Sequence, residues 1–115
     1  MKGLIEVQES DNIKIVVIIV NAGFAEEIVH MAREVGARGA TIINARGEGM
    51  FHRSFLGISV DTEKEMILML AKEDTANKIM LEIKEKAGLK TPAHSICFML
   101  PVDQMTGMSE RRFLD

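Results

Sequence analysis

The stretch "IKIVVIIVNAGFAEEIVHMAREVGARGATIINA", residues 13–45, decides the fold, because its apolar residues change their spacing twice along the chain. Residues 13–20 are short, β-branched and almost wholly apolar, which is typical of a strand that is buried between neighbours. Asn21 and Gly23 then interrupt this run. The first part of the stretch therefore predicts a buried strand that ends near residue 20.

The rest of the stretch predicts a helix and a second strand. From Phe24 to Val35 the apolar residues recur at helical spacing, and charged residues occupy the other side. Gly36 supplies the helix stop. Residues 40–45, "ATIINA", are again typical of a strand, so the first half of the chain is predicted to be strand, helix, strand.

The same order returns in the second half of the chain. Residues 65–71, "EMILMLA", predict a third strand, and either Asp74 or Thr75 is expected to cap a helix that follows. Gly88 ends this helix, and residues 95–100, "SICFML", predict the fourth strand. The chain therefore contains two strand–helix–strand units.

Two such units predict the α+β class and a ferredoxin-like βαββαβ sandwich, in which a four-stranded antiparallel sheet carries both helices on one face. A chain of 115 residues with 47% hydrophobic content is close to the commonest size of a single domain. We expect residues 1–115 to form one domain, with a core over about 13–107 and a tail at 109–115.

The other face of such a sheet has no helix of the same chain to cover it. The side chains left uncovered are those of one alternating set: Lys14, Val16, Ile18 and Val20, or else Ile13, Ile15, Val17 and Ile19. At ~25 cal/mol per Å² of apolar area, covering this face could contribute on the order of 10 kcal/mol. An apolar patch of that size is an association surface, so a closed homo-oligomer is predicted.

Composition excludes several classes of function. The chain has 14 basic and 17 acidic residues and a net charge of -3, which argues against nucleic acid or an anionic membrane as a partner. No apolar run approaches the roughly 20 residues that cross a bilayer, and the N-terminal residues lack a signal peptide's apolar stretch. A cytoplasmic protein without membrane insertion is expected.

The single cysteine, Cys97, lies in an apolar strand and is expected to behave as a small hydrophobe.

Glycines and cations gather around the predicted strand at residues 40–45. Gly36 and Gly39 precede this strand, and "RGEG", residues 46–49, follows it directly. Glycine lets a ligand approach the backbone closely, and backbone amides beside the Arg46 guanidinium are suited to a phosphate. A plain turn needs the same glycines. Spacing alone leaves both interpretations open.

The whole pattern resembles the nitrogen-regulatory P-II signalling proteins, from about Ile13 to Gly107. The resemblance depends on "GARGATIINARGEG", where such proteins carry a similar G-x-x-G-x-T…(K/R)-G-x-G run, and on "EKAGLKT" before the last strand. It implies a homotrimer whose three sheets face inward and which binds adenine nucleotides in clefts between subunits. It also implies a sensor rather than an enzyme, with a long loop between the second and third strands that engages a target protein, here unidentified.

The resemblance also implies a set of nucleotide-binding residues. Thr41 matches the family threonine near the adenine, and Gly47 and Gly49 match the glycines at the loop base. Gly88 and the following "LKTPAH" occupy the segment that wraps the phosphates. The candidate residues for ATP, ADP or AMP are Thr41, Arg46, Gly47, Glu48, Gly49, Gly88, Lys90, Thr91 and His94.

Three departures from the family pattern concern the phosphates. Met50-Phe51 stands where Arg-Gln is common, "KTPAH" has no glycine, and "DQMTGM" after the last strand carries no cation. Because the chain has fewer cations here than the family pattern, it gives weaker support for a triphosphate ligand.

The loop at residues 50–64, "MFHRSFLGISVDTEK", is short for the family and has no tyrosine, as the whole chain has none. Uridylylation of a loop tyrosine, known in part of the family, is therefore excluded. The loop is also unusually apolar. We expect these apolar side chains to fold back on the body of the protein; the alternative is a docking surface that ligand binding exposes.

A metal-binding trimer is the alternative function, because the divalent-cation tolerance proteins share this architecture. His52, His94 and the loop carboxylates would then be the ligands, although the spacing of the histidines is not that of a typical zinc site. An enzyme has the least support, since no nucleophile and base form an evident pair.

Overall fold

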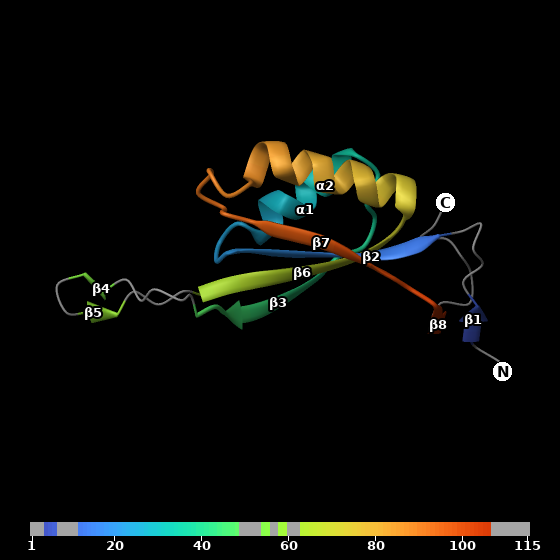
Figure 1. Ribbon diagram of the computed structural model, residues 1–115, viewed down its shortest axis with the longest axis horizontal. Helices are drawn as coiled ribbons and strands as arrows, with labels where there is room; N and C mark the ends of the chain where they lie inside the picture. Colours follow the sequence, from blue (N-terminus) through green and yellow to red (C-terminus); the bar gives the residue numbers. More distant parts are fainter. Residues whose placement is uncertain (1–3, 7–11, 49–53, 56–57, 60–62, 107–115) are drawn as a thin grey trace.

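The main sheet consists of four antiparallel strands in the spatial order β3-β6-β2-β7. The computed structural model describes residues 4–6, 12–48, 54–55, 58–59 and 63–106. The sheet strands are β2 (Ile13–Asn21), β3 (Thr41–Arg46), β6 (Glu63–Lys72) and β7 (Ile96–Pro101), and the helices are α1 (Ala25–Glu34) and α2 (Glu73–Ala87). Both helices lie on the same face of the sheet (Figure 1). The ferredoxin-like architecture predicted from the sequence is confirmed.

The core lies between the sheet and the helices. Val16, Ile18 and Val20 of β2 point into it and are 0% exposed. The neighbouring strand β6 adds Ile67 and Met69, which are buried as well. The helices cover these side chains with Ile28, Val29 and Ala32 of α1 and with Ala76, Ile79 and Ile83 of α2. The helices therefore cover the face of β2 that carries the even-numbered residues.

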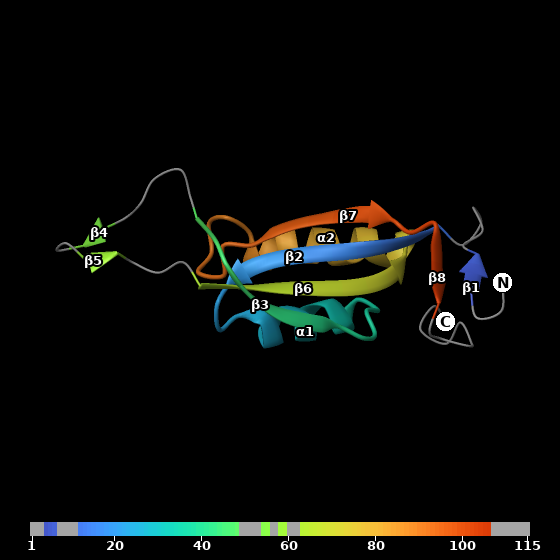
Figure 2. The same cartoon turned by 90° about the horizontal axis from the view of Figure 1, so that it is seen from below.

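The opposite face of the sheet carries mainly apolar side chains, and no helix of the described residues lies over it; Figure 2 looks onto this face. In β2 it carries Ile15, Val17 and Ile19, which lie beside Leu100, Phe98 and Ile96 of β7 in the strand register. These three β7 side chains are among the exposed large hydrophobic residues of the protein. We call this surface the open sheet face.

The two helices end differently, although a glycine follows each. Gly36, just after α1, has φ +116°, a left-handed conformation that favours glycine. Gly88, just after α2, has φ -70° and ψ -169°, which is extended backbone. A side chain at Gly88 is excluded by contact instead, because a Cβ atom there would lie 2.8 Å from the Lys84 carbonyl oxygen.

The predicted cap of α2 is wrong. The helix begins at Glu73, before both Asp74 and Thr75, and its N-cap is Lys72, which makes no side-chain capping bond. Asn12 secures this helix end instead. Its carbonyl oxygen accepts a 2.9 Å hydrogen bond from the Glu73 amide, and its side-chain amide donates to the Glu73 carboxylate. A residue far away in the sequence thus replaces a local cap.

Two pairs of short strands were not predicted, because strands of two or three residues have no readable periodicity. β1 (Leu4–Glu6) pairs with β8 (Gln104–Thr106), and β4 (Ser54–Phe55) pairs with β5 (Ile58–Ser59). The β4–β5 pair stands beyond the end of the main sheet, and the β1–β8 pair lies at the opposite end of the molecule (Figures 1 and 2). The expectation that the loop folds back on the body is therefore wrong for β4 and β5.

Neither helix of the described residues has the length and the apolar character needed to cross a lipid bilayer.

Candidate functional site

The end of β3 carries the first group of predicted ligand-binding residues. The Arg46 guanidinium lies 4.0 Å from the Glu48 carboxylate, and both side chains are 69% exposed. An ion pair this exposed and this long is worth about 0–1 kcal/mol at most, so Arg46 can turn to another anion at little cost. Gly49, the last residue of the motif, lies outside the described residues.

Gly47 lies directly against the side chain of Lys64 on β6. A Cβ atom at Gly47 would come within 3.2 Å of Lys64 Cε and 3.3 Å of its Cγ. The glycine therefore lets the chain leave β3 over the aliphatic part of this lysine. A side chain at this position would require the Lys64 side chain to shift.

The connection between α2 and β7 carries the second group of candidates and forms a tight turn. The Thr91 amide and the Thr91 hydroxyl both donate to the Gly88 carbonyl, at 3.0 and 2.8 Å, and the His94 amide donates to the Thr91 carbonyl at 3.0 Å. Ser95 is buried, and its amide and its hydroxyl both donate to the Ala87 carbonyl, at 3.0 and 2.5 Å. We call residues 88–94 the 88–94 turn.

The polar side chains at the surface of the 88–94 turn are those of Lys90 and His94, which are both exposed. His94 adopts a positive φ of 48°, and its Nδ1 atom lies 2.8 Å from the Leu89 carbonyl oxygen. A carbonyl oxygen only accepts, so Nδ1 carries a proton in this contact, and a neutral imidazole then keeps Nε2 as an acceptor. The turn thus presents an ammonium group and an oriented imidazole to solvent.

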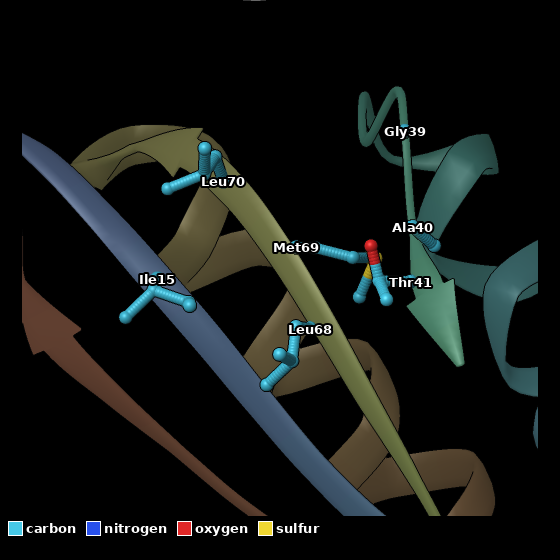
Figure 3. Close-up of a pocket in the computed structure, with 7 residues that line it drawn as sticks. All are labelled: Ile15, Gly39, Ala40, Thr41, Leu68, Met69 and Leu70. Atoms are coloured by element: carbon cyan, nitrogen blue, oxygen red, sulfur yellow. The ribbon is translucent and has the colours of Figure 1, made fainter. Parts of the chain in front are cut away.

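Thr41, the third part of the predicted site, borders a hollow of about 430 Å³. Figure 3 shows the lining residues: Ile15 from β2, Leu68, Met69 and Leu70 from β6, and Gly39, Ala40 and Thr41 at the start of β3. Thr41 supplies the only polar side chain among them. An apolar hollow with a single hydroxyl is suited to a flat heteroaromatic ring.

The three parts of the site lie apart within one copy of the chain. Thr41 and Arg46 are at opposite ends of β3, roughly 17 Å apart at about 3.3 Å per residue. The end of β3 and the 88–94 turn lie at the same end of the sheet (Figures 1 and 2), but on opposite edges, because β6 and β2 separate β3 from β7. At about 4.8 Å per strand these edges are roughly 14 Å apart.

Sequence reasoning missed the apolar partners of Thr41. Ile15, Leu68 and Leu70 belong to strands that were recognised, but only strand pairing shows that they surround this threonine. The alternating pattern of the strands could have indicated these neighbours, because it places all three side chains on one face of the sheet. Asn21 was also interpreted only as the residue that ends a strand.

Two other kinds of reactive group have no evident place in this site. Among the residues that the structure describes, no group of three or more His, Cys, Asp or Glu side chains could hold a metal ion. Cys97 is half-buried, and burial raises the pKa of its thiol to about 11. Because the thiolate is the nucleophilic form, the raised pKa disfavours nucleophilic reaction at Cys97 at neutral pH.

The four-stranded sheet with two helices on one face defines a ferredoxin-like α+β protein. The sequence model of one family with this fold, described as "Nitrogen regulatory protein P-II", matches residues 13–111. The chain therefore belongs to the P-II family of signalling regulators, as its sequence motifs indicated. A comparison with curated protein sequences gave no match.

Solved structures agree with this fold. A PII-like signalling protein of Thermus thermophilus is 22% identical, with a TM-score of 0.64 over 82% of this chain and 89% of that one. The GlnK–ATP complex of B. subtilis is 15% identical, with a TM-score of 0.63 over 81% and 84% of the two chains. CutA from Synechococcus elongatus is 9% identical, with a TM-score of 0.65 over 91% and 87%. At these identities the likeness concerns the fold alone.

Proposed function

We propose that this chain is a cytoplasmic P-II-type signal-transduction regulator that binds an adenine nucleotide between the subunits of a homotrimer. It forms one P-II-like domain and has no catalytic activity of its own. Nucleotide binding changes the arrangement of the connection between β3 and β6, and this connection modulates a partner protein. The energetics require that the nucleotide bind the two arrangements with different affinity.

The division of the candidate site is the observation that carries this proposal. The apolar hollow beside Thr41 fits a nucleobase, whereas the cationic groups that fit phosphates are Arg46 at the far end of β3 and Lys90 on the opposite edge of the sheet. A second copy of the chain can bring its 88–94 turn to the β3 edge of the first. The site is then complete only in the assembly.

The open sheet face supports the assembly on which this site depends. Apolar side chains lie on this face of all four strands, and those of Ile43, Ile96, Phe98 and Leu100 are exposed in the single chain. Burial of apolar area at about 25 cal/mol per Å² favours association through this face. Three sheets that face inward would cover this apolar surface.

The family and one similar structure support the choice of ligand. The chain belongs to a family of regulatory proteins, and the GlnK structure with the same fold is a complex with ATP. We extend this ligand class to the present chain because an apolar hollow, a guanidinium and an ammonium group are the complementary chemistry for a base and its phosphates.

Calorimetric titration of the purified protein with ATP, ADP and AMP tests the proposal. At least one nucleotide should bind, and Arg46→Ala or Lys90→Ala should each weaken binding roughly tenfold, as expected for the loss of a charge-assisted contact. Lys78→Ala is the matched control, because Lys78 is an exposed lysine on α2 outside the site. Equal affinity of all three variants would contradict the assigned site.

The same titration with divalent ions tests the alternative of a metal-binding trimer. The Nδ1 contact of His94 with a backbone carbonyl leaves Nε2 oriented toward solvent, which is the arrangement of many metal-binding histidines. His52, the other proposed ligand, lies outside the described residues. If zinc or copper binds and no nucleotide does, the metal-binding function replaces the nucleotide sensor.

A further inference from the structure

Asn21, the last residue of β2, connects the two polar parts of the site that lie on opposite edges of the sheet. Its backbone amide donates to the Ala93 carbonyl at 2.9 Å, and its side-chain Nδ2 donates to the Pro92 carbonyl at 2.8 Å. On its other side, Oδ1 accepts a 2.6 Å hydrogen bond from the Lys64 ammonium group. One side chain thus contacts both the 88–94 turn and β6.

Lys64 determines which way the Asn21 amide points. An ammonium group only donates, so it requires the carbonyl oxygen of the amide, and Nδ2 must then face the turn. The stem of Lys64 also lies against Gly47, where the chain leaves β3. The contacts therefore run from the end of β3 through Lys64 and Asn21 to the Pro92 carbonyl.

We propose that Asn21 is a positioning residue for the ligand site, which holds the 88–94 turn in its binding shape and links that turn to the end of β3 through Lys64. This inference rests on the proposed nucleotide site for its functional consequence. Its structural consequence, a turn whose order depends on the Asn21 amide, does not require any ligand.

Asn21→Asp separates positioning from a general loss of stability. An aspartate keeps the backbone amide and offers Lys64 a full negative charge, so the thermal midpoint should stay within about 2 °C of wild type. The same change removes the Nδ2 donor and places a carboxylate oxygen beside the Pro92 carbonyl. The turn should therefore loosen while the rest of the protein keeps its stability.

Two measurements at pH 7.5 follow from this design, with Asn77→Asp on α2 as the matched control. Amide hydrogen exchange of the ligand-free protein should become about fivefold faster at Thr91 and His94, which corresponds to the loss of one ordinary hydrogen bond. Calorimetric titration with ATP should show about fivefold weaker binding. Lys64→Met, which keeps the stem beside Gly47, should shift both quantities in the same direction by a smaller factor.

The outcomes separate this inference from the proposed function. Unchanged exchange in the turn of Asn21→Asp overturns the inference, as does faster exchange with unchanged ATP affinity. A fall in thermal midpoint that accounts for the whole loss of affinity overturns it too, because Asn21 is then only a structural residue. If ATP does not bind the wild-type protein, the proposed function fails, and the exchange measurement alone still decides whether Asn21 orders the turn.

Discussion

Gly88 illustrates how a single residue shapes the site without touching a ligand. Its backbone is extended, so an L-residue could adopt the same dihedral angles. The restriction is steric, since a Cβ atom would lie 2.8 Å from the Lys84 carbonyl oxygen. The glycine allows the chain to leave α2 within one residue and begin the 88–94 turn, which brings Lys90 to the surface.

Gly88→Ala should therefore destabilise the protein by about 1–3 kcal/mol, the usual cost of forcing atoms into a packed site. Urea denaturation followed by circular dichroism measures this. Gly39→Ala is the matched control, because nothing lies within 4 Å of a Cβ atom there. The control should change stability by less than about 1 kcal/mol, and in the stabilising direction, since alanine restricts the unfolded chain. Equal stability of the two variants would show that the last turn of α2, at Lys84, shifts to make room for the extra methyl group.

At the scale of elements, the start of α1 depends on a strand that is distant in the sequence. The Glu65 carboxylate of β6 accepts hydrogen bonds from the Gly23 amide at 2.6 Å and from the Ala25 amide at 3.3 Å. Phe24, the N-cap of α1, makes no side-chain capping bond. A negative charge at this helix end also interacts favourably with the positive end of the helix dipole. Glu65 therefore replaces a local cap and joins α1 to the sheet.

Glu65→Gln should lower the free energy of unfolding by about 1 kcal/mol, because it keeps the shape but removes the charge from these hydrogen bonds. Thermal unfolding and urea denaturation both report this change. Glu63→Gln provides the comparison, since Glu63 is exposed on the same strand and makes no such contact with α1. A loss of stability as large in Glu63→Gln as in Glu65→Gln would mean that net charge, not the cap, is responsible.

At the scale of the whole molecule, the two faces of the sheet differ in how far their side chains are exposed. One face is buried beneath α1 and α2, and the other exposes apolar side chains to solvent in the single chain. Leu100 on β7 belongs to the open sheet face and is 50% exposed, whereas Leu81 on α2 is 57% exposed on the helical side. These two leucines have similar exposure and differ in the surface to which they belong.

Leu100→Asp should convert the proposed trimer into monomers at micromolar concentration, because each subunit would bring a carboxylate into an apolar interface. Light scattering after gel filtration measures the mass directly. Leu81→Asp should leave the trimer intact. A trimeric Leu100→Asp variant, or a monomeric wild-type protein, would show that the open sheet face is not the assembly surface.

The local pattern of side chains was enough to predict the main elements and their order. Short apolar runs and a helical period of about four residues are properties of a short segment, and they placed β2, α1, β3, β6, α2 and β7 within three residues of their ends. The glycines at 36 and 88 marked both helix ends for the same reason. The family, too, could be recognised, since its motif lies in consecutive residues around β3.

The capping of both helices and the surroundings of the candidate site were decided by the tertiary structure. These contacts form only after strands that are far apart in sequence have paired. They are the hydrogen bonds of Asn12 with Glu73, of Glu65 with Gly23, and of Asn21 with Lys64 and Pro92. The alternating pattern of β2 was also ambiguous, because both of its faces are apolar. The helices pack on Val16, Ile18 and Val20, beside which β6 presents Ile67 and Met69 on the same face. Which face the helices cover depends on contacts between segments and not on the order of residues within one segment.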